Sequence, residues 1–86
     1  MAYTIELAPA ARRQLKKLDS ELRRRVARSI DGLAKDPRPD GVVKLTDVSP
    51  PPYRVREREY RIVYAIEGDR LLVLVVRIAH RGEVYR

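Results

Sequence analysis

The sequence predicts an α+β fold: one strand, a helical hairpin and then an antiparallel β-meander, in the order β-α-α-β-β-β. Three observations support this order. Apolar residues recur at helical spacing up to residue 33, prolines interrupt the chain at 37 and 39, and β-branched and aromatic residues dominate residues 53–79. One face of an antiparallel sheet is expected to pack on the helices. A chain of 86 residues is expected to form one small domain, residues 1–86.

The first part of the chain contains a short strand and two amphipathic helices. Residues 3–7 alternate weakly and predict a strand, and Pro9 fits the first turn of a helix, where no N–H donor is needed. Asp19 and Ser20 are good caps for a second helix, which the later prolines end. The apolar residues that mark the two helical faces are Leu7, Ala11, Leu15 and Leu18, and then Leu22, Val26, Ile30 and Leu33.

The second part contains an irregular segment and then three strands. Residues 40–52 show no periodic pattern, although Val42, Val43 and Leu45 are expected to enter the core. The predicted strands are residues 53–57, 60–66 and 70–79. The last of them is almost continuously apolar, which is typical of a strand covered on both faces.

The composition narrows the classes of function. The net charge is +7, which favours a polyanionic partner such as nucleic acid or an acidic protein. The chain has no cysteine and one histidine, which excludes disulfides and cysteine nucleophiles and disfavours a zinc site. No apolar run is long enough to cross a bilayer, so we expect a cytoplasmic protein with no membrane partner.

Three arginines fall on two neighbouring strand candidates. Arg54 and Arg56 are two residues apart, so they project from one face of a strand about 7 Å from each other, and Arg61 follows on the next strand. Guanidinium groups are planar forks that bind phosphate bidentately and stay charged at neutral pH. The alternative is a solvated basic face whose arginines pair loosely with Glu57 and Glu59.

The end of the chain adds three further candidates. His80 is a candidate general base, or else an ordinary histidine at a strand end. Arg81 is suited to stabilising the charge that develops on phosphorus during transfer. Tyr85 is suited to stacking on a splayed base or bonding a phosphate, or else to anchoring the tail in the core. Because the acidic residues form no metal-binding cluster in the sequence, phosphoryl chemistry here is expected to need no metal and no cofactor.

Over nearly its whole length, the chain resembles the RelE family of bacterial toxins, within the RelE/ParE superfamily. The segments that carry the resemblance are MAYTIEL at 1–7, KLTDV at 44–48, YRVREREYRIVY at 53–64 and RIAHRGEVYR at 77–86. The resemblance implies a small ribonuclease that enters the ribosomal A site and cleaves mRNA there. It also implies a RelB-like antitoxin that wraps around the toxin, and operator DNA that is reached only through the toxin–antitoxin complex.

The resemblance also implies roles for individual residues. Arg54 and Arg56 match two basic residues of the family on the strand that enters the hairpin, and Arg61 matches the arginine of the YR pair. Arg81 matches the arginine after the last core strand, and Tyr85 matches the tyrosine of the terminal VY. His80 falls where some relatives have histidine and others lysine. The best-known pattern has lysine where this chain has Arg54 and Arg56, and arginine does not give up its proton at neutral pH. Proton abstraction is therefore expected from His80 or from water.

Together these residues predict an mRNA endoribonuclease. The ribose 2′-OH attacks the adjacent phosphorus with His80 as the base, the arginines hold the phosphate, and Tyr85 positions a base or helps to protonate the leaving 5′-oxygen. The products are a 2′,3′-cyclic or 3′-phosphate and a 5′-hydroxyl. Two alternatives stand beside this prediction: a ParE-like inhibitor of DNA gyrase, and a non-catalytic module whose basic surface binds an antitoxin or nucleic acid.

Overall fold

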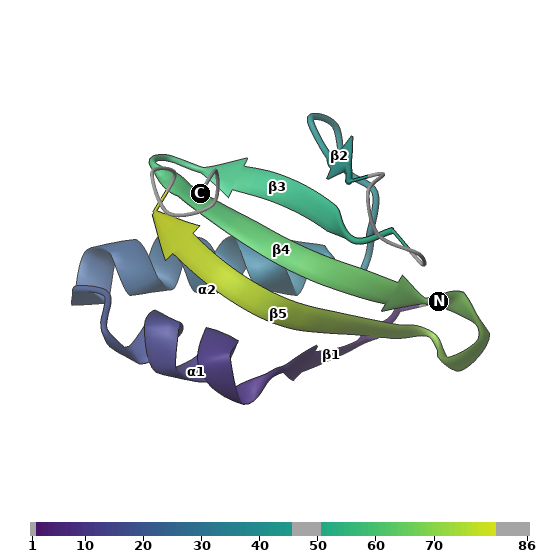
Figure 1. Cartoon of the computed structure of the whole chain (residues 1–86), viewed down its shortest axis with the longest axis horizontal. Coiled ribbons are helices and arrows are strands. Elements are labelled where there is room, and N and C mark those ends of the chain that lie inside the picture. Colours follow the sequence, from purple (N-terminus) through teal and green to yellow (C-terminus); the bar gives the residue numbers. More distant parts are fainter. Residues whose placement is uncertain (1, 46–50, 81–86) are drawn as a thin grey trace.

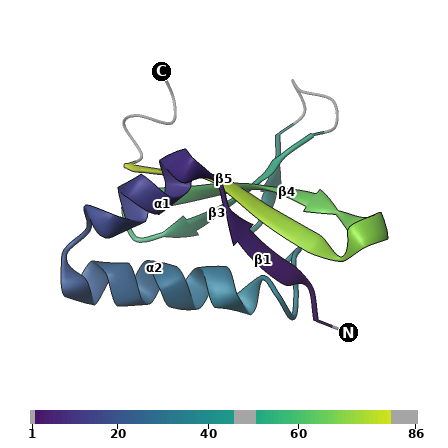
Figure 2. The same cartoon turned by 90° about the horizontal axis from the view of Figure 1, so that it is seen from below.

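The chain folds into a five-stranded sheet with two helices on one face. The structure is a computed structural model that describes residues 2–45 and 51–80. Its elements are β1 (Thr4–Leu7), α1 (Pro9–Lys16), α2 (Ser20–Gly32), β2 (Val43–Lys44), β3 (Tyr53–Glu57), β4 (Tyr60–Glu67), the 3-10 helix η1 (Gly68–Arg70) and β5 (Leu72–His80). Both helices cover the same face of the sheet (Figure 1 and Figure 2). The predicted α+β class is confirmed.

The helices begin and pack as their sequences predict. Pro9 occupies the first turn of α1, and the Asp19 carboxylate caps α2 by accepting a hydrogen bond from the Leu22 backbone N–H at 2.9 Å. The apolar stripe of each helix faces the sheet; its fully buried members are Ala11 on α1 and Val26, Ile30 and Leu33 on and just after α2. In the described part of the chain, no helix is long and apolar enough to cross a membrane.

The order of strands in the sheet is β1-β5-β4-β3-β2. β3, β4 and β5 form the predicted antiparallel meander, but β1 lies parallel to β5, with Ile5 paired to Val73. The sequence predicts the antiparallel meander but not the parallel pairing of β1 with β5. Ala8 extends the pairing by donating a backbone hydrogen bond to Val75 at 2.8 Å just before α1 begins. Because β1 runs in the same direction as β5 and leads directly into α1, α1 packs against the apolar side chains of the interior strand β5.

The segment after α2 is also more ordered than expected. Val43 and Lys44 form the two-residue strand β2, which pairs with the start of β3. The expectation that Val43 enters the core was wrong, because its side chain is 41% exposed, whereas Val42 packs against the core. Val43 pairs with Arg54 and so points away from the helices. Its side chain therefore lies outside the core between the sheet and the helices.

Two tyrosines tie the segment after α2 to the sheet. Tyr64 is fully buried and donates a 2.6 Å hydrogen bond to the Pro37 carbonyl oxygen, and its ring stacks on Tyr53 with centroids 6.0 Å apart. Arg38 lies over the Tyr53 ring, and its Nε donates to the Tyr53 hydroxyl at 3.3 Å. This hydrogen bond lowers the pKa of Tyr53, whereas burial raises the pKa of Tyr64 to about 12. Tyr64 is therefore a core residue of the sheet.

The hairpin between β3 and β4 holds a strained residue. Arg58 has a φ of 56°, a backbone conformation that residues other than glycine, asparagine and aspartate adopt at a cost. Replacing Arg58 with glycine is expected to raise the free energy of unfolding by about 0.5–1 kcal/mol. Glycine avoids the steric cost of about 1–2 kcal/mol of a left-handed residue, which exceeds the entropic cost of about 0.5–1 kcal/mol that glycine itself brings. Urea unfolding followed by circular dichroism measures the change. Glu59→Gly is the matched control, since Glu59 has no positive φ, and a larger gain in that variant would contradict the explanation.

Candidate functional site

The register of the strands decides which side of the sheet each candidate residue faces. Residues paired directly across an antiparallel sheet project from the same face, and neighbours along one strand project from opposite faces. Val55, Ile62 and Ile78 are paired across β3, β4 and β5, and all three are buried beneath the helices. Residues one position away along each strand therefore face the side that carries no helix, which we call the open face.

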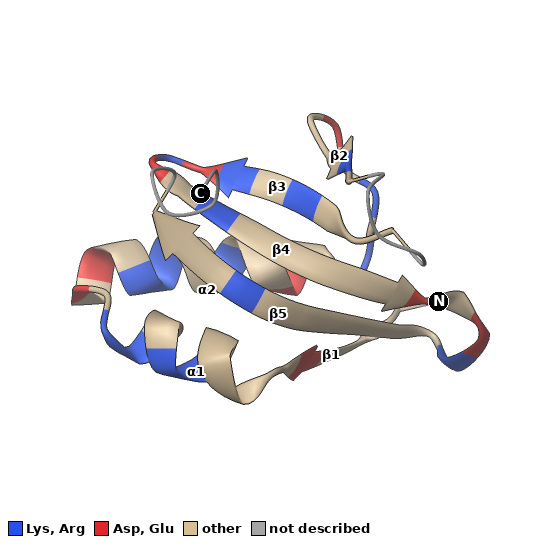
Figure 3. Ribbon diagram, viewed as in Figure 1, with Lys and Arg blue, Asp and Glu red and all other residues tan. Residues whose placement is uncertain are grey.

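Four arginines lie on the open face. Arg56 pairs with Arg61, so the Cα atoms of these two residues lie about 5 Å apart. Arg54 pairs with Val63, and Val63 pairs in turn with Arg77 on β5. Figure 3 shows these basic segments on the three adjacent strands. The structure thus brings the three predicted arginines together and adds a fourth; we call Arg54, Arg56, Arg61 and Arg77 the arginine face.

The members of the arginine face differ in exposure. Arg61 is 5% exposed and Arg54 is half-buried, whereas Arg56 and Arg77 are exposed. Neither Arg56 nor Arg77 forms an ion pair with a residue in the described part of the chain. Exposed guanidinium groups are of a chemical type suited to binding the oxygens of a phosphate group.

Glu57 behaves differently from the alternative considered above. Glu57 faces the helices, because it pairs with Tyr60, and its carboxylate accepts a hydrogen bond from the Ser29 hydroxyl on α2. The Glu57 carboxylate is thus directed away from the arginine face. Within residues 2–45 and 51–80, no three His, Cys, Asp or Glu side chains come together as a possible metal site.

Arg77 was missed as a site residue in the sequence. A β-bulge separates the pairs Val63–Arg77 and Tyr64–Val75, so that Val75 and Val73 face the helices although Arg77 faces outward. The signal was present, because Arg77 is the one charge inside an otherwise apolar run. The register that places Arg77 in one cross-strand row with Val63 and Arg54 depends on strand pairing and could not be read locally.

His80 lies on the other side of the sheet from the arginine face. It pairs with Tyr60 and faces the helices, with its ring edge against the Tyr60 ring at 5.6 Å between centroids and an interplanar angle of 87°. Both residues line a recess of about 250 Å³ beside Lys17 at the end of α1. The structure therefore does not bring His80 onto the arginine face. Arg81 and Tyr85 lie outside the described residues.

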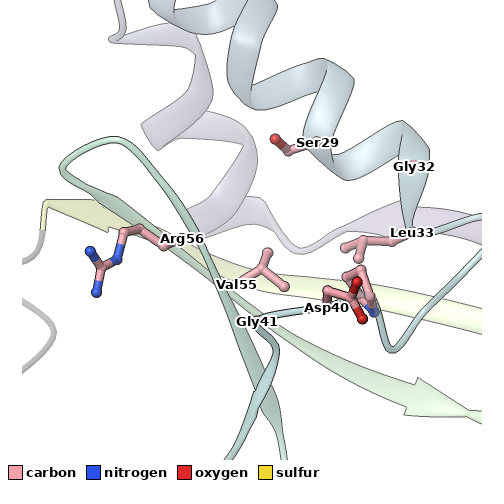
Figure 4. A pocket seen from close by; sticks show the side chains of 8 residues that line it. Ser29, Gly32, Leu33, Asp40, Gly41, Val55 and Arg56 are labelled. Atoms are coloured by element: carbon pink, nitrogen blue, oxygen red, sulfur yellow. The ribbon is translucent and has the colours of Figure 1, made fainter.

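A second hollow opens at the edge of β3. Its volume is about 490 Å³, and it is lined by Ser29, Gly32, Leu33, Pro39, Asp40, Gly41, Val55 and Arg56. Figure 4 shows Leu33 and Val55 at this groove, with the Arg56 side chain directed away from them. β2 covers only the start of β3, so among the described strands none pairs with residues 55–57 on this edge. The groove thus combines apolar side chains, such as Leu33 and Val55, with polar ones, such as Ser29 and Asp40, beside a strand edge that no described strand pairs.

Comparison with known proteins identifies the family. Residues 5–85 match the family described as "ParE toxin of type II toxin-antitoxin system, parDE". The chain belongs to this family, within the RelE/ParE superfamily. It is therefore the toxin of a type II toxin–antitoxin system.

Individual relatives in the superfamily are named RelE or RelG. The chain is 29% identical to Toxin RelG of Mycobacterium tuberculosis, with 100% of this chain and 99% of the relative covered. The toxin–antitoxin complex RelBE2 of the same organism contains a chain with 26% identity and a TM-score of 0.80, covering 95% of this chain and 94% of that one. The archaeal RelE–RelB complex of Pyrococcus horikoshii shares the fold, with 24% identity, a TM-score of 0.83, and 95% and 98% coverage.

Proposed function

We propose that this toxin is a ribosome-dependent endoribonuclease that cleaves mRNA in the A site and acts in the cytoplasm. The observation that carries the proposal is the gathering of Arg54, Arg56, Arg61 and Arg77 on one face across three adjacent strands. Phosphoryl transfer needs positioning and stabilisation of charge more than covalent chemistry from the protein, and a cluster of guanidinium groups supplies both. The similarity to toxins named RelE and RelG supports the same reaction class.

In this proposal the reaction is an intramolecular transesterification. The ribose 2′-oxygen loses its proton and attacks the adjacent phosphorus, and the bond from phosphorus to the 5′-oxygen breaks. Exposed Arg56 and Arg77 bind the phosphate oxygens, and buried Arg61 holds a fixed guanidinium beside them. Arg81 and Tyr85 are proposed to offset the growing charge and to assist protonation of the 5′-oxygen. The products are a 2′,3′-cyclic phosphate and a 5′-hydroxyl.

His80, the candidate general base, lies on the other side of the sheet from an RNA strand that is bound on the arginine face. His80 stands at the end of β5 on the helix side, so a strand held on the arginine face reaches it only by passing around the end of the sheet. If His80 is the base, His80→Ala is expected to lower the cleavage rate by about 10²–10⁴-fold. Single-turnover cleavage of ribosome-bound mRNA measures this. An unchanged rate would assign proton abstraction to water. Tyr60→Ala, which removes the ring that packs against the imidazole, controls for loss of packing.

The decisive experiment is primer extension on an mRNA in a purified translation system with added toxin. Discrete cuts within A-site codons are expected, and they should weaken when Arg54 and Arg56 are both replaced by alanine. Lys35→Ala/Arg70→Ala is the matched control, because both of these residues are exposed and the net charge changes by the same amount.

A ParE-like inhibitor of DNA gyrase is the second candidate, since the matched family is described as ParE. Intact mRNA together with loss of gyrase supercoiling would favour that candidate and reject the ribonuclease.

We also propose that the partner of this toxin is a RelB-like antitoxin that wraps around it, and that operator DNA is bound only through their complex. The groove at the β3 edge supports this proposal, because residues 55–57 present an edge that no described strand pairs and extended peptides add to such edges. The net charge of +7 favours an acidic partner. An antitoxin that binds only the folded toxin raises the melting temperature. An equal melting temperature with and without the antitoxin would reject the proposal.

A further inference from the structure

The recess beside His80 is formed where α1 takes the place of β1 along β5. β1 pairs with β5 only as far as Val75, so the later residues of this edge of β5 have no strand beside them in the described part of the chain. α1 lies there instead (Figure 1 and Figure 2), and the Gln14 side-chain oxygen accepts a hydrogen bond from the Ile78 backbone N–H at 2.8 Å. We call the recess the Gln14 recess; it is lined by Gln14, Lys17, Leu18, Tyr60, Ile78 and His80.

The hydrogen bond to Ile78 fixes the orientation of the Gln14 amide. Because the Ile78 N–H is a donor, the atom that meets it is the amide oxygen. The amide nitrogen, which carries two N–H donors, has no hydrogen-bond partner among the described residues. Gln14 is half-buried and held at its oxygen, so it offers these two donors to a ligand in the recess. The ammonium group of Lys17 adds further donors and no acceptor.

Two aromatic rings form another part of the Gln14 recess. The rings of Tyr60 and His80 lie 5.6 Å apart between centroids, at an interplanar angle of 87°. Proteins that recognise single-stranded RNA stack unpaired bases on aromatic side chains and bind the base edges through hydrogen bonds. The recess has a volume of about 250 Å³, below the range of about 300–1,000 Å³ for pockets that enclose drug-sized ligands. Its size and chemistry therefore suit one planar ring system.

Two other ligands suit the Gln14 recess less well. A phosphate group is disfavoured because the recess lies at the C-terminal end of α1, where the helix carries partial negative charge. An extended peptide that added to the edge of β5 would need the Ile78 N–H, which Gln14 already occupies. A nucleobase is uncharged and needs no strand edge, and it has acceptor atoms for the donors of Gln14 and Lys17.

The Gln14 recess and the arginine face meet at the same end of the sheet. Tyr60 directly precedes Arg61 on β4, and His80 directly follows Ala79, the partner of Arg61 on β5. Because neighbours along a strand face opposite sides, the recess lies behind Arg61. An RNA strand that leaves the arginine face over this end of the sheet therefore passes His80 and reaches the recess next.

We propose that the Gln14 recess binds the base of the nucleotide on the 5′ side of the scissile phosphate. This inference rests on the ribonuclease function proposed above. That nucleotide carries the attacking 2′-OH, so a base held in the recess brings its ribose to His80 while its 3′-phosphate stays on the arginine face. The donors of Gln14 and Lys17 select guanine and uracil, whose edges carry carbonyl oxygens, over adenine and cytosine, which carry an amino group there. Gln14 is thus a specificity-determining residue.

The test compares the wild-type toxin with Gln14→Glu, which keeps an oxygen for the Ile78 N–H but replaces the donor nitrogen with an acceptor. The isolated toxin is titrated with guanosine, uridine, adenosine and cytidine while NMR follows the rings of Tyr60 and His80. The wild type is expected to bind guanosine and uridine at least about fivefold more tightly than the other two. Gln14→Glu is expected to reverse this order. Lys35→Ala changes the net charge equally at an exposed position outside the recess and should keep the wild-type order.

Primer extension on ribosome-bound mRNAs with different A-site codons gives the second readout. The wild-type toxin is expected to cut after guanine or uracil, and Gln14→Glu after adenine or cytosine. A change in base preference separates recognition from a structural role of Gln14, because loss of packing alone would lower cleavage at all codons alike.

The outcomes separate this inference from the ribonuclease proposal. Equal binding of all four nucleosides by the wild type, or no change at Tyr60 and His80 with any of them, would overturn the Gln14 recess as a base site, even if the toxin cleaves mRNA. A reversed nucleoside order with unchanged cut sites would overturn its assignment to the 5′ nucleotide. A reversed nucleoside order in a toxin that leaves ribosome-bound mRNA intact would support the recess and reject the ribonuclease.

Discussion

Replacing Arg61 with alanine is expected to lower the rate of ribosome-dependent mRNA cleavage by about 10²–10³-fold. This is the typical effect of removing one preorganised hydrogen-bond donor that stabilises the transition state. Arg61 is 5% exposed and lies directly opposite Arg56, so the sheet fixes its guanidinium before RNA binds. A fixed charge stabilises the phosphorane-like transition state without reorganisation at the moment of reaction. Single-turnover cleavage measured by primer extension gives the rate.

Two further variants separate catalysis from folding. Arg61→Lys keeps the charge but replaces a planar fork with a point charge, so an intermediate rate is expected. Arg70→Ala removes an exposed arginine on η1 that pairs with Glu67 at the end of β4, and it should cleave at the wild-type rate. If Arg61→Ala has a wild-type melting temperature and cleaves as fast as the wild type, the arginine face is not the reaction site.

The largest effect on stability is expected at Tyr64. Its side chain is fully buried between the sheet and the segment after α2, stacks on Tyr53, and bonds the Pro37 carbonyl oxygen. Tyr64→Ala should lower the free energy of unfolding by about 3–5 kcal/mol, because a large cavity remains. Tyr64→Phe should lower it by about 1–3 kcal/mol, because the carbonyl loses its donor. Urea unfolding measures both changes, and a loss below 1 kcal/mol for Tyr64→Ala would show that the site collapses around the missing ring.

The same tyrosine predicts how stability depends on pH. Burial raises the pKa of Tyr64 to about 12, from 10.0 for the free side chain, so the folded protein holds this proton more tightly than the unfolded chain. The stabilisation is complete below pH 10 and is lost as the pH rises from 10 to about 12, so the free energy of unfolding falls across that window. Tyr64→Phe, which has no proton to lose, should show a smaller fall, and an equal fall would assign the effect to another group.

The sequence alone was enough for the features that depend on short-range patterns. The apolar spacing located both helices and the faces that they bury, and Asp19 and Pro9 marked where the helices begin. The hairpin that carries Arg54, Arg56 and Arg61 was also predictable, since alternation along each strand and a short turn decide which side chains share a face. The segment at 53–64 also carries part of the family resemblance. The family and the grouping of these three arginines could therefore be predicted from the same residues.

Only the tertiary structure decided the features that depend on which strands pair and in what register. The parallel placement of β1 beside β5 joins residues that are far apart in the chain, and no local pattern encodes the direction of that pairing. The bulge between Val63 and Tyr64 allows Arg77 to join the arginine face while Val75 stays in the core. The pairing of His80 with Tyr60 turns it toward the helices, because a side chain's face is fixed by its register and not by its distance from the arginines in sequence.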